Sequence, residues 1–196
     1  NELNMSLLKE NNLSSEAVDR IKNLEFQGYQ FESAEASLEL IFKEISGEFK
    51  PYFQVLDSRV QVNYDRDGHQ RADAVLKVIV QDEIEHTASD GNGPVDALNK
   101  ALRKALLRFF PELEEVKLTD YKVRVINEQD GTSAKVRVLI ESSDGKSTWS
   151  TVGVSQNIID ASWQALSDSF NYKLARTRNS EKPNGSSNKV KHSNMV

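Results

Sequence analysis

Apolar residues recur with two different periods along the chain, and the period changes near residue 50. Before that point the spacing is helical, which predicts two helices within residues 14–45. Ser14 or Ser15 is suited to cap the first helix, Gly28 to end it, and Ser33 to cap the second. The apolar positions that carry this prediction are Val18, Ile21, Leu24, Ala34, Leu38, Ile41 and Ile45.

From Tyr52 onward apolar and polar residues alternate, which is typical of strands. The pattern predicts strands over 52–64, with room for a bulge near Asp57 and Ser58, and over 74–80, joined by the turn sequence Asp65-Arg66-Asp67-Gly68. A short third strand over 84–88 leads into a glycine-rich loop. A helix then follows and is expected to end before Pro111.

The same order of elements is repeated in the second half of the chain. Strands are predicted over 116–126, 133–141 and 148–154, with turns at 128–131 and 143–145, and a helix over 157–174. The two helix starts align at an offset of 64 residues, with Asp96 on Asp160 and Ala97 on Ala161, and Asp57–Val62 align with Asp120–Val125. This duplication predicts an α+β fold of two βββα repeats related by a pseudo-twofold axis.

These patterns divide the chain into three parts. Residues 1–47 form a helical linker subdomain, residues 48–178 form the duplicated domain, and residues 179–196 are a polar tail expected to be disordered. No apolar run reaches the roughly 18 residues of a membrane-spanning helix, so we expect no membrane partner and a cytoplasmic location. The chain has no cysteine, which excludes disulfides and cysteine-ligated metals.

Charge is distributed unevenly along the chain. Residues 171–196 contain six Lys and Arg against one acidic residue, a local charge of +5, so residues 1–170 sum to −10 within the total of −5. An acidic folded part disfavours a nucleic-acid-binding surface, because such surfaces need Lys and Arg to neutralise phosphates. We therefore expect no nucleic-acid partner.

The loops that open the two repeat helices are the candidate ligand-binding segments. Pro94 suits a first helical turn, and free amide hydrogens at a helix start suit a carboxylate. Two such starts beside apolar strands would fit an amino acid with a branched side chain, with backbone carbonyls, Asp90 or Asn92 as acceptors for its ammonium. Alternatively each loop is a plain turn, and Asp96 and Asp160 only favour their helix starts. The candidate effector-binding residues are Asp90, Gly91, Asn92, Gly93, Pro94, Gly153, Val154, Ser155, Gln156 and Asn157.

Residue sets for conventional catalysis are missing from the sequence. His69, His86 and His192 are scattered without the paired spacing of metal ligands, so no metal site is expected. No Gly-x-Ser-x-Gly motif occurs. The acidic residues Asp65, Asp67, Asp82, Glu83 and Glu85 are expected to be solvated, and Trp149, Trp163, Tyr121 and Phe170 to pack in a core or interface.

The segment Gly91-Asn92-Gly93-Pro94-Val95-Asp96-Ala97 resembles the carboxy-terminal regulatory domain of the citramalate synthase and 2-isopropylmalate synthase family. Segments 118–125, 139–145, 149–166 and 25–37 look more like the citramalate synthase branch. The resemblance covers about Val18 to Leu174. It implies a dimeric module that binds the end-product amino acid, isoleucine, and inhibits a distant active site.

The resemblance also implies what this chain does not contain. The family's catalytic barrel, its divalent metal and its acetyl-CoA site have no positions here, so this piece is expected to be non-catalytic and to need no cofactor. The whole enzyme would condense pyruvate with acetyl-CoA to (R)-citramalate in isoleucine synthesis. Two alternatives remain at this point. One is a leucine-binding domain of a 2-isopropylmalate synthase, and the other is a structural dimerisation or nucleic-acid-binding module.

Overall fold

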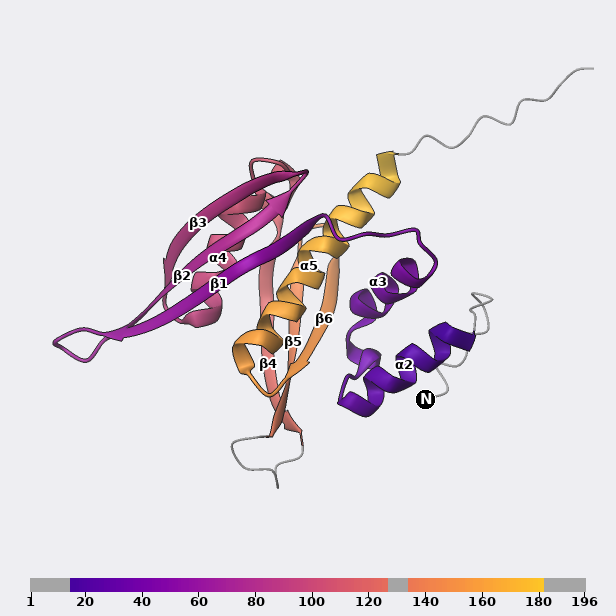
Figure 1. The fold of residues 1–196 in the computed structure, drawn as a ribbon, viewed down its shortest axis with the longest axis horizontal. Coiled ribbons are helices and arrows are strands. Elements are labelled where there is room, and N and C mark those ends of the chain that lie inside the picture. Colours follow the sequence, from indigo (N-terminus) through magenta and orange to yellow (C-terminus); the bar gives the residue numbers. More distant parts are fainter. Residues whose placement is uncertain (1–14, 127–133, 182–196) are drawn as a thin grey trace, which may run out of the picture.

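The computed structural model describes residues 15–126 and 134–181 (Figure 1). A helical part comes first, followed by two units that each contain three strands and a helix. This order confirms the predicted α+β fold with two βββα units. The elements are α2 (Ser15–Gln27), η1 (Phe31–Ser33), α3 (Glu35–Ile45), β1 (Phe53–Tyr64), β2 (Gln70–Val80), β3 (Glu83–Gly91), α4 (Pro94–Leu106), η2 (Pro111–Glu115), β4 (Lys117–Ile126), β5 (Lys135–Ser143), β6 (Thr148–Ser155) and α5 (Ile158–Glu181).

Each unit contains an antiparallel sheet of three consecutive strands, β1-β2-β3 and β4-β5-β6. The first strand of each sheet is an edge strand, and each carries a register shift near its start, between Val55 and Asp57 in β1 and between Leu118 and Asp120 in β4. The shift in β1 confirms the bulge expected there. Its repetition at the equivalent place in β4 supports the internal duplication.

One hydrophobic core joins the two units. The inward positions of β2, such as Leu76 and Val78, are fully buried under α4, whose buried stripe includes Leu98 and Leu102. Buried residues of β5, β6 and α5 belong to the same core, including Trp149. Both α4 and α5 start on the lower side of the molecule in Figure 1. Neither unit alone buries all of its apolar surface. The two units therefore stabilise each other by packing together in one core.

The linker helices pack on the second unit. A separate apolar cluster joins Ile21, Phe31 and Leu38 of the linker to Val152 and Val154 of β6. Polar contacts reinforce it, since Arg137 donates to the carbonyl oxygen of Gly28 over 2.6 Å. In Figure 1, α2 and α3 accordingly lie beside β6 and α5, on the side away from β1, β2 and β3.

Several predicted boundaries differ from the observed ones. Ser33 does not cap α3: it ends the short helix η1, and the N-cap position is Ala34, which makes no side-chain cap. Strand β3 runs to Gly91, because its pairing with β2 continues as far as Ala72. Helix α5 extends past residue 174 to Glu181. Residues 179–181 of the tail predicted over 179–196 therefore belong to α5. Outside the described residues lie Ser14, the turn predicted at 128–131, and residues 182–196, which include His192.

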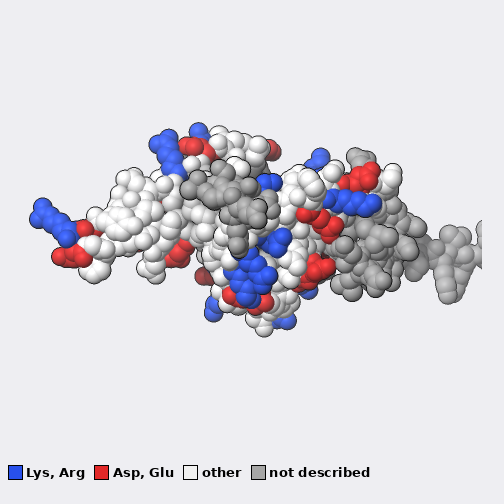
Figure 2. Space-filling model, turned by 90° about the horizontal axis from the view of Figure 1, so that it is seen from below, with Lys and Arg blue, Asp and Glu red and all other residues white. Residues whose placement is uncertain are grey.

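Charged side chains of both signs are interspersed over the face shown in Figure 2. Positively and negatively charged side chains gather at the left end of the molecule in this view. Uncharged surface separates them from the other charged side chains. Within residues 15–126 and 134–181, no helix is long and apolar enough to cross a membrane.

Candidate functional site

The first turn of α4 has unused hydrogen-bond donors. Its N-cap is Gly93, which has extended backbone angles and provides no side-chain cap, and Pro94 occupies the first helical turn without an N–H. Asp96 does not cap its own helix. Its Oδ2 instead accepts hydrogen bonds from the Asn92 N–H at 3.0 Å and from Lys100 Nζ at 2.9 Å. The start of α4 therefore offers amide hydrogens to an anionic group.

The start of α5 differs, although the two loops align in the sequence. Asn157 Oδ1 accepts a hydrogen bond from the Ile159 N–H at 2.8 Å, and Ser155 Oγ accepts one from the Asn157 N–H at 3.1 Å. Further back, the Val154 N–H donates to Gln164 Oε1 on α5 itself. Local side chains thus satisfy donors of this second loop, so the repeats are not equivalent as ligand sites.

Two of the predicted site glycines serve the packing of helix on strand. A Cβ on Gly91 would overlap the backbone nitrogen of Ala97, and a Cβ on Gly153 would overlap the carbonyl oxygen of Ala161. Ala97 and Ala161 are equivalent positions in the two repeats. In contrast, a Cβ on Gly93 would meet open space. The close approach made possible by Gly91 and Gly153 is therefore to their own helices.

A cavity of about 640 Å³ lies beside the first turns of α4. Its lining combines apolar side chains with polar groups, and it opens between α4 and β4. Asn99 Oδ1 is the notable atom, because it is buried and has no hydrogen-bond partner among the described residues. The lining residues are Val95, Asp96, Asn99, Arg103, Glu114, Val116, Lys117, Leu118 and Tyr121.

The charged groups around this cavity are largely fixed by other contacts. Burial alone would raise the pKa of Asp96, but the hydrogen bonds from Lys100 and from the Asn92 N–H outweigh it and hold that pKa below its ordinary value. Arg103 donates to the carbonyl oxygens of Val116 and Glu114, which fastens η2 and the start of β4 to α4. Asp96 is therefore ionised near neutral pH, while Asn99 retains a free acceptor.

Tyr121 connects this cavity to the other helix start. It lines the cavity from β4, and its hydroxyl lies 2.7 Å from the hydroxyl of Ser162 in the first turns of α5. Ser162 also donates to the Ile158 carbonyl oxygen. A single side chain thus links the cavity beside α4 to α5. The cavity itself has no lining residue from either predicted loop.

The structure places the predicted loop residues in different environments. Asp90 and Asn92 are exposed, Gly91, Gly93 and Pro94 are partly buried, and all five precede the cavity that begins at Val95. Gly153 and Val154 are buried within β6, Ser155 is partly buried, and Gln156 and Asn157 are exposed. Asn99 and Tyr121 were not predicted as site residues. Asn99 lies on the polar side of the amphipathic helix α4, so the sequence pattern does not indicate that its side-chain oxygen is buried.

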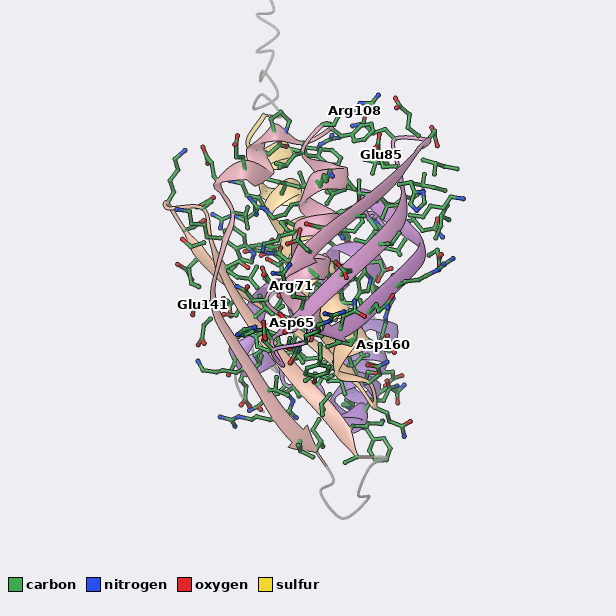
Figure 3. All side chains as sticks on the ribbon, turned by 90° about the vertical axis from the view of Figure 1, so that its left-hand side faces the viewer. Asp65, Arg71, Glu85, Arg108, Glu141 and Asp160 are labelled. Atoms are coloured by element: carbon green, nitrogen blue, oxygen red, sulfur yellow. The ribbon has the colours of Figure 1, made fainter. Side chains whose placement is uncertain are left out.

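The other candidate groups have structural explanations. Asp65, Asp67 and His69 gather at the exposed tip of the β1–β2 hairpin, where Asp65 Oδ1 accepts the N–H groups of Asp67 and His69 as part of the turn. Arg108 pairs with Glu83 at 2.8 Å and with Glu85 at 2.6 Å, and Figure 3 shows Arg108 beside Glu85. Trp149 is buried and donates to Ser169, and Phe170 is buried as expected.

An exposed apolar stripe follows the first strand of each sheet. Residues opposite each other in an antiparallel pair face the same side, and Val62 pairs with buried Ala72 while Val123 pairs with buried Val138. The stripe therefore lies on the core side of both sheets, beyond the cover of the helices. It consists of Val60, partly buried, and Val62, Tyr64, Tyr121, Val123 and Val125, which are 40, 70, 37, 39 and 52% exposed.

Comparison with known proteins gives this geometry a family context. The chain is 56% identical over 160 residues to the (R)-citramalate synthase of Aquifex aeolicus, which covers 81% of this chain and 30% of that protein. It is 49% identical over 182 residues to the (R)-citramalate synthase of Geobacter sulfurreducens, covering 92% of this chain and 34% of that protein. The chain thus spans about a third of the length of these relatives.

The chain is also similar, at lower identity, to 2-isopropylmalate synthases. The 2-isopropylmalate synthase of Aquifex aeolicus is 36% identical over 103 residues, which cover 53% of this chain and 18% of that protein. The family described as LeuA allosteric (dimerisation) domain matches residues 32–174, from η1 into α5. That range includes both βββα units, the cavity beside α4 and the exposed apolar stripe. The chain belongs to the LeuA allosteric (dimerisation) domain family.

Proposed function

We propose that this chain is the effector-binding and dimer-forming domain of an (R)-citramalate synthase, and that isoleucine is the effector that inhibits the enzyme. The high identity to curated citramalate synthases supports the parent activity. Isoleucine is the end product that the family resemblance implies. Coupling between an effector site and a distant active site is typically worth about 1 to 3 kcal/mol.

The effector site in this proposal is the cavity between α4 and β4. The single observation that carries it is Asn99 Oδ1, a buried acceptor without a partner on the cavity wall. An amino acid's ammonium would satisfy that oxygen, and leaving it unsatisfied costs about 1 to 3 kcal/mol. The uncapped first turn of α4 would receive the carboxylate.

The remaining wall suits a branched aliphatic side chain. Val116 and Leu118 provide apolar surface, and Tyr121 adds its ring from β4. The predicted loop 90–94 belongs to this proposal as the segment that positions the first turn of α4. The loop 153–157 does not contact the ligand in this proposal. It is connected to the cavity only indirectly, because it precedes α5, whose Ser162 contacts Tyr121.

The partner in this proposal is a second copy of the chain. Val62, Tyr64, Val123 and Val125 lie at core-facing positions of their sheets and remain exposed, and the same strand in both repeats carries them. A surface of this kind is typical of an interface. Pairing two copies about a twofold axis would bury both stripes and bring a partner to the cavity wall, because Tyr121 belongs to the stripe and to the cavity.

Asn99→Leu tests the effector site by calorimetry with isoleucine. Because the variant removes an unpaired buried acceptor, we expect unfolding stability to stay equal or rise, while isoleucine affinity falls by about tenfold or more. The matched control is Asn63→Leu on β1, where the amide is exposed and bonds to Asp73. Equal isoleucine binding by the wild-type chain and Asn99→Leu would refute the site.

A further inference from the structure

A second cavity, of about 540 Å³, lies where the linker helices meet α5 and the start of β1. It is separate from the cavity beside α4, because the two have no lining residue in common. Its walls are mainly apolar and come from α2, α3, β1, β6 and α5. The apolar lining residues are Leu24, Tyr29, Ile41, Pro51, Phe53, Val55, Val152 and Trp163.

The polar side of this cavity contains a carboxyl group with no cation beside it. Asp168 Oδ2 accepts a hydrogen bond from Ser37 Oγ at 2.6 Å, and Ser37 Oγ accepts one from the Val152 N–H at 3.1 Å. No hydrogen bond or ion pair of the described residues brings Asp168 a positively charged partner. A partly buried carboxylate of this kind is costly unless a cation accompanies it.

A second polar group on the same side lacks a hydrogen-bond partner altogether. Ser167 Oγ is buried and has no hydrogen-bond partner among the described residues. Its neighbours are already engaged, because Asn171 accepts from the Tyr52 N–H, and Gln164 Oε1 accepts from Tyr29 and from the Val154 N–H. On this side of the cavity, the Asp168 carboxyl thus has no cationic partner and the Ser167 hydroxyl has no hydrogen-bond partner. Both groups can accept hydrogen bonds from a ligand.

The charged residues at the mouth of the cavity do not provide Asp168 with a cationic partner. Arg20 reaches Glu44 at 2.7 Å, so its guanidinium is paired at the rim and does not neutralise Asp168. Glu44 adds to the negative field that acts on Asp168. A second carboxylate entering the cavity would be repelled by both acidic groups, whereas an ammonium would be attracted by them.

We propose that this cavity binds a small primary amine, whose ammonium donates to Asp168 and Ser167 and whose apolar body lies against Trp163, Phe53 and Ile41. The volume lies in the range of small-molecule sites. The body of such a ligand is a short aliphatic or aromatic group. A zwitterionic amino acid is disfavoured here because its carboxylate would meet Glu44 and Asp168.

Calorimetry on the full chain at about pH 8, where an Asp168 with a pKa of about 7 is mostly ionised, tests this proposal with three probes of similar shape. Isopentylamine carries the ammonium, isopentyl alcohol is neutral, and isovalerate carries a carboxylate on a similar body. We expect the amine to bind at least about tenfold more tightly than the alcohol, and isovalerate not to bind. In a parallel NMR titration the indole resonance of Trp163 should shift with the amine and stay unchanged with isoleucine.

Asp168→Asn supplies the matched variant, since the amide keeps the shape of the carboxyl and removes its charge. Amine affinity should fall by about tenfold or more, while isoleucine affinity should not change. Asp73→Asn, on the exposed face of β2, is the control and should bind the amine as the wild type does. Equal binding of amine and alcohol, or unchanged amine binding by Asp168→Asn, overturns the proposal and leaves the isoleucine site untouched.

Discussion

The hydroxyl of Tyr121 lies 2.7 Å from the hydroxyl of Ser162, and this contact joins β4 to the first turns of α5. Tyr121 belongs at once to the cavity beside α4 and to the exposed apolar stripe. A ligand that moves the Tyr121 ring would therefore affect both helix α5 and the proposed dimer surface. In the proposed function, such a shared side chain would connect effector binding to the arrangement of two chains.

Tyr121→Phe should separate the role of this hydroxyl from that of the ring. Ser162 keeps its bond to the Ile158 carbonyl oxygen, so we expect the unfolding free energy to fall by only about 0.5 to 1.5 kcal/mol. Isoleucine should still bind, because the ring remains on the cavity wall, but its effect on the α5 start should weaken. Urea denaturation measures the first effect and NMR shifts at Ser162 the second. Unchanged ligand-induced shifts at Ser162 would contradict the route.

Val123→Glu should disrupt the dimer that we propose. The substitution puts a charge in the middle of the exposed apolar stripe, where a second copy would have to bury it. Sedimentation equilibrium should then show a monomer at concentrations where the wild-type chain is dimeric. Arg124→Glu is the control, since Arg124 lies opposite Arg137 on the other side of β4 and should leave the dimer intact. A dimer that survives Val123→Glu would place the interface elsewhere.

Alanine substitutions at the loop glycines should give opposite results. Gly153→Ala forces a Cβ into the backbone of Ala161, so we expect a loss of about 1 to 3 kcal/mol or more in unfolding free energy. Gly93→Ala meets open space and an extended backbone, so stability should change by less than about 1 kcal/mol. Thermal unfolding monitored by circular dichroism compares the two. A destabilised Gly93→Ala variant would contradict the open space around Gly93.

Stability should depend on pH through Asp168. Burial, together with the charge of Glu44, raises the pKa of Asp168 to about 7 despite the hydrogen bond from Ser37. An unfolded aspartate has a pKa of about 3.9, so the native state holds the proton more tightly and this contribution is fully present below about pH 4. It is lost as pH rises through about 7.

Asp168→Asn should flatten this part of the pH dependence. The other charged or titratable groups in the surrounding cavity are Arg20 and Glu44, which pair with each other, and Tyr29, whose pKa is raised by burial and by Asp168. The measurement is the unfolding free energy from urea titrations between about pH 4.5 and 8. A wild-type profile parallel to that of Asp168→Asn would show that Asp168 ionises normally in the folded chain.

Much of the fold follows from local pattern. Alternation of apolar residues in β2 places Leu76 and Val78 in the core, and the repeated order of elements predicts two βββα units. The boundaries that failed depend on tertiary contacts. Ser33 has the right chemistry for a cap, but the short helix η1 uses it, and β3 extends to Gly91 only because β2 continues to pair with it.

The candidate site was harder to predict from the sequence than the fold. The motif at Gly91 lies next to the cavity that we propose as the effector site, but one glycine of the motif serves helix packing, which only the approach of Ala97 reveals. The aligned loop around Asn157 looked equivalent, yet its donors are satisfied locally. Asn99 and Tyr121 come together through the docking of one unit on the other, and such a contact between distant segments leaves no local pattern to detect.

An NMR titration of the isotope-labelled chain with isoleucine, and with leucine for comparison, tests most directly whether isoleucine binds between α4 and β4. We expect saturable binding, tighter for isoleucine, with the largest shifts at the amides of Val95 and Asp96 and the side chain of Asn99. No saturable shift with either amino acid, or shifts confined to residues outside the cavity between α4 and β4, would contradict it. Tighter binding of leucine would instead assign the domain to a leucine-regulated enzyme.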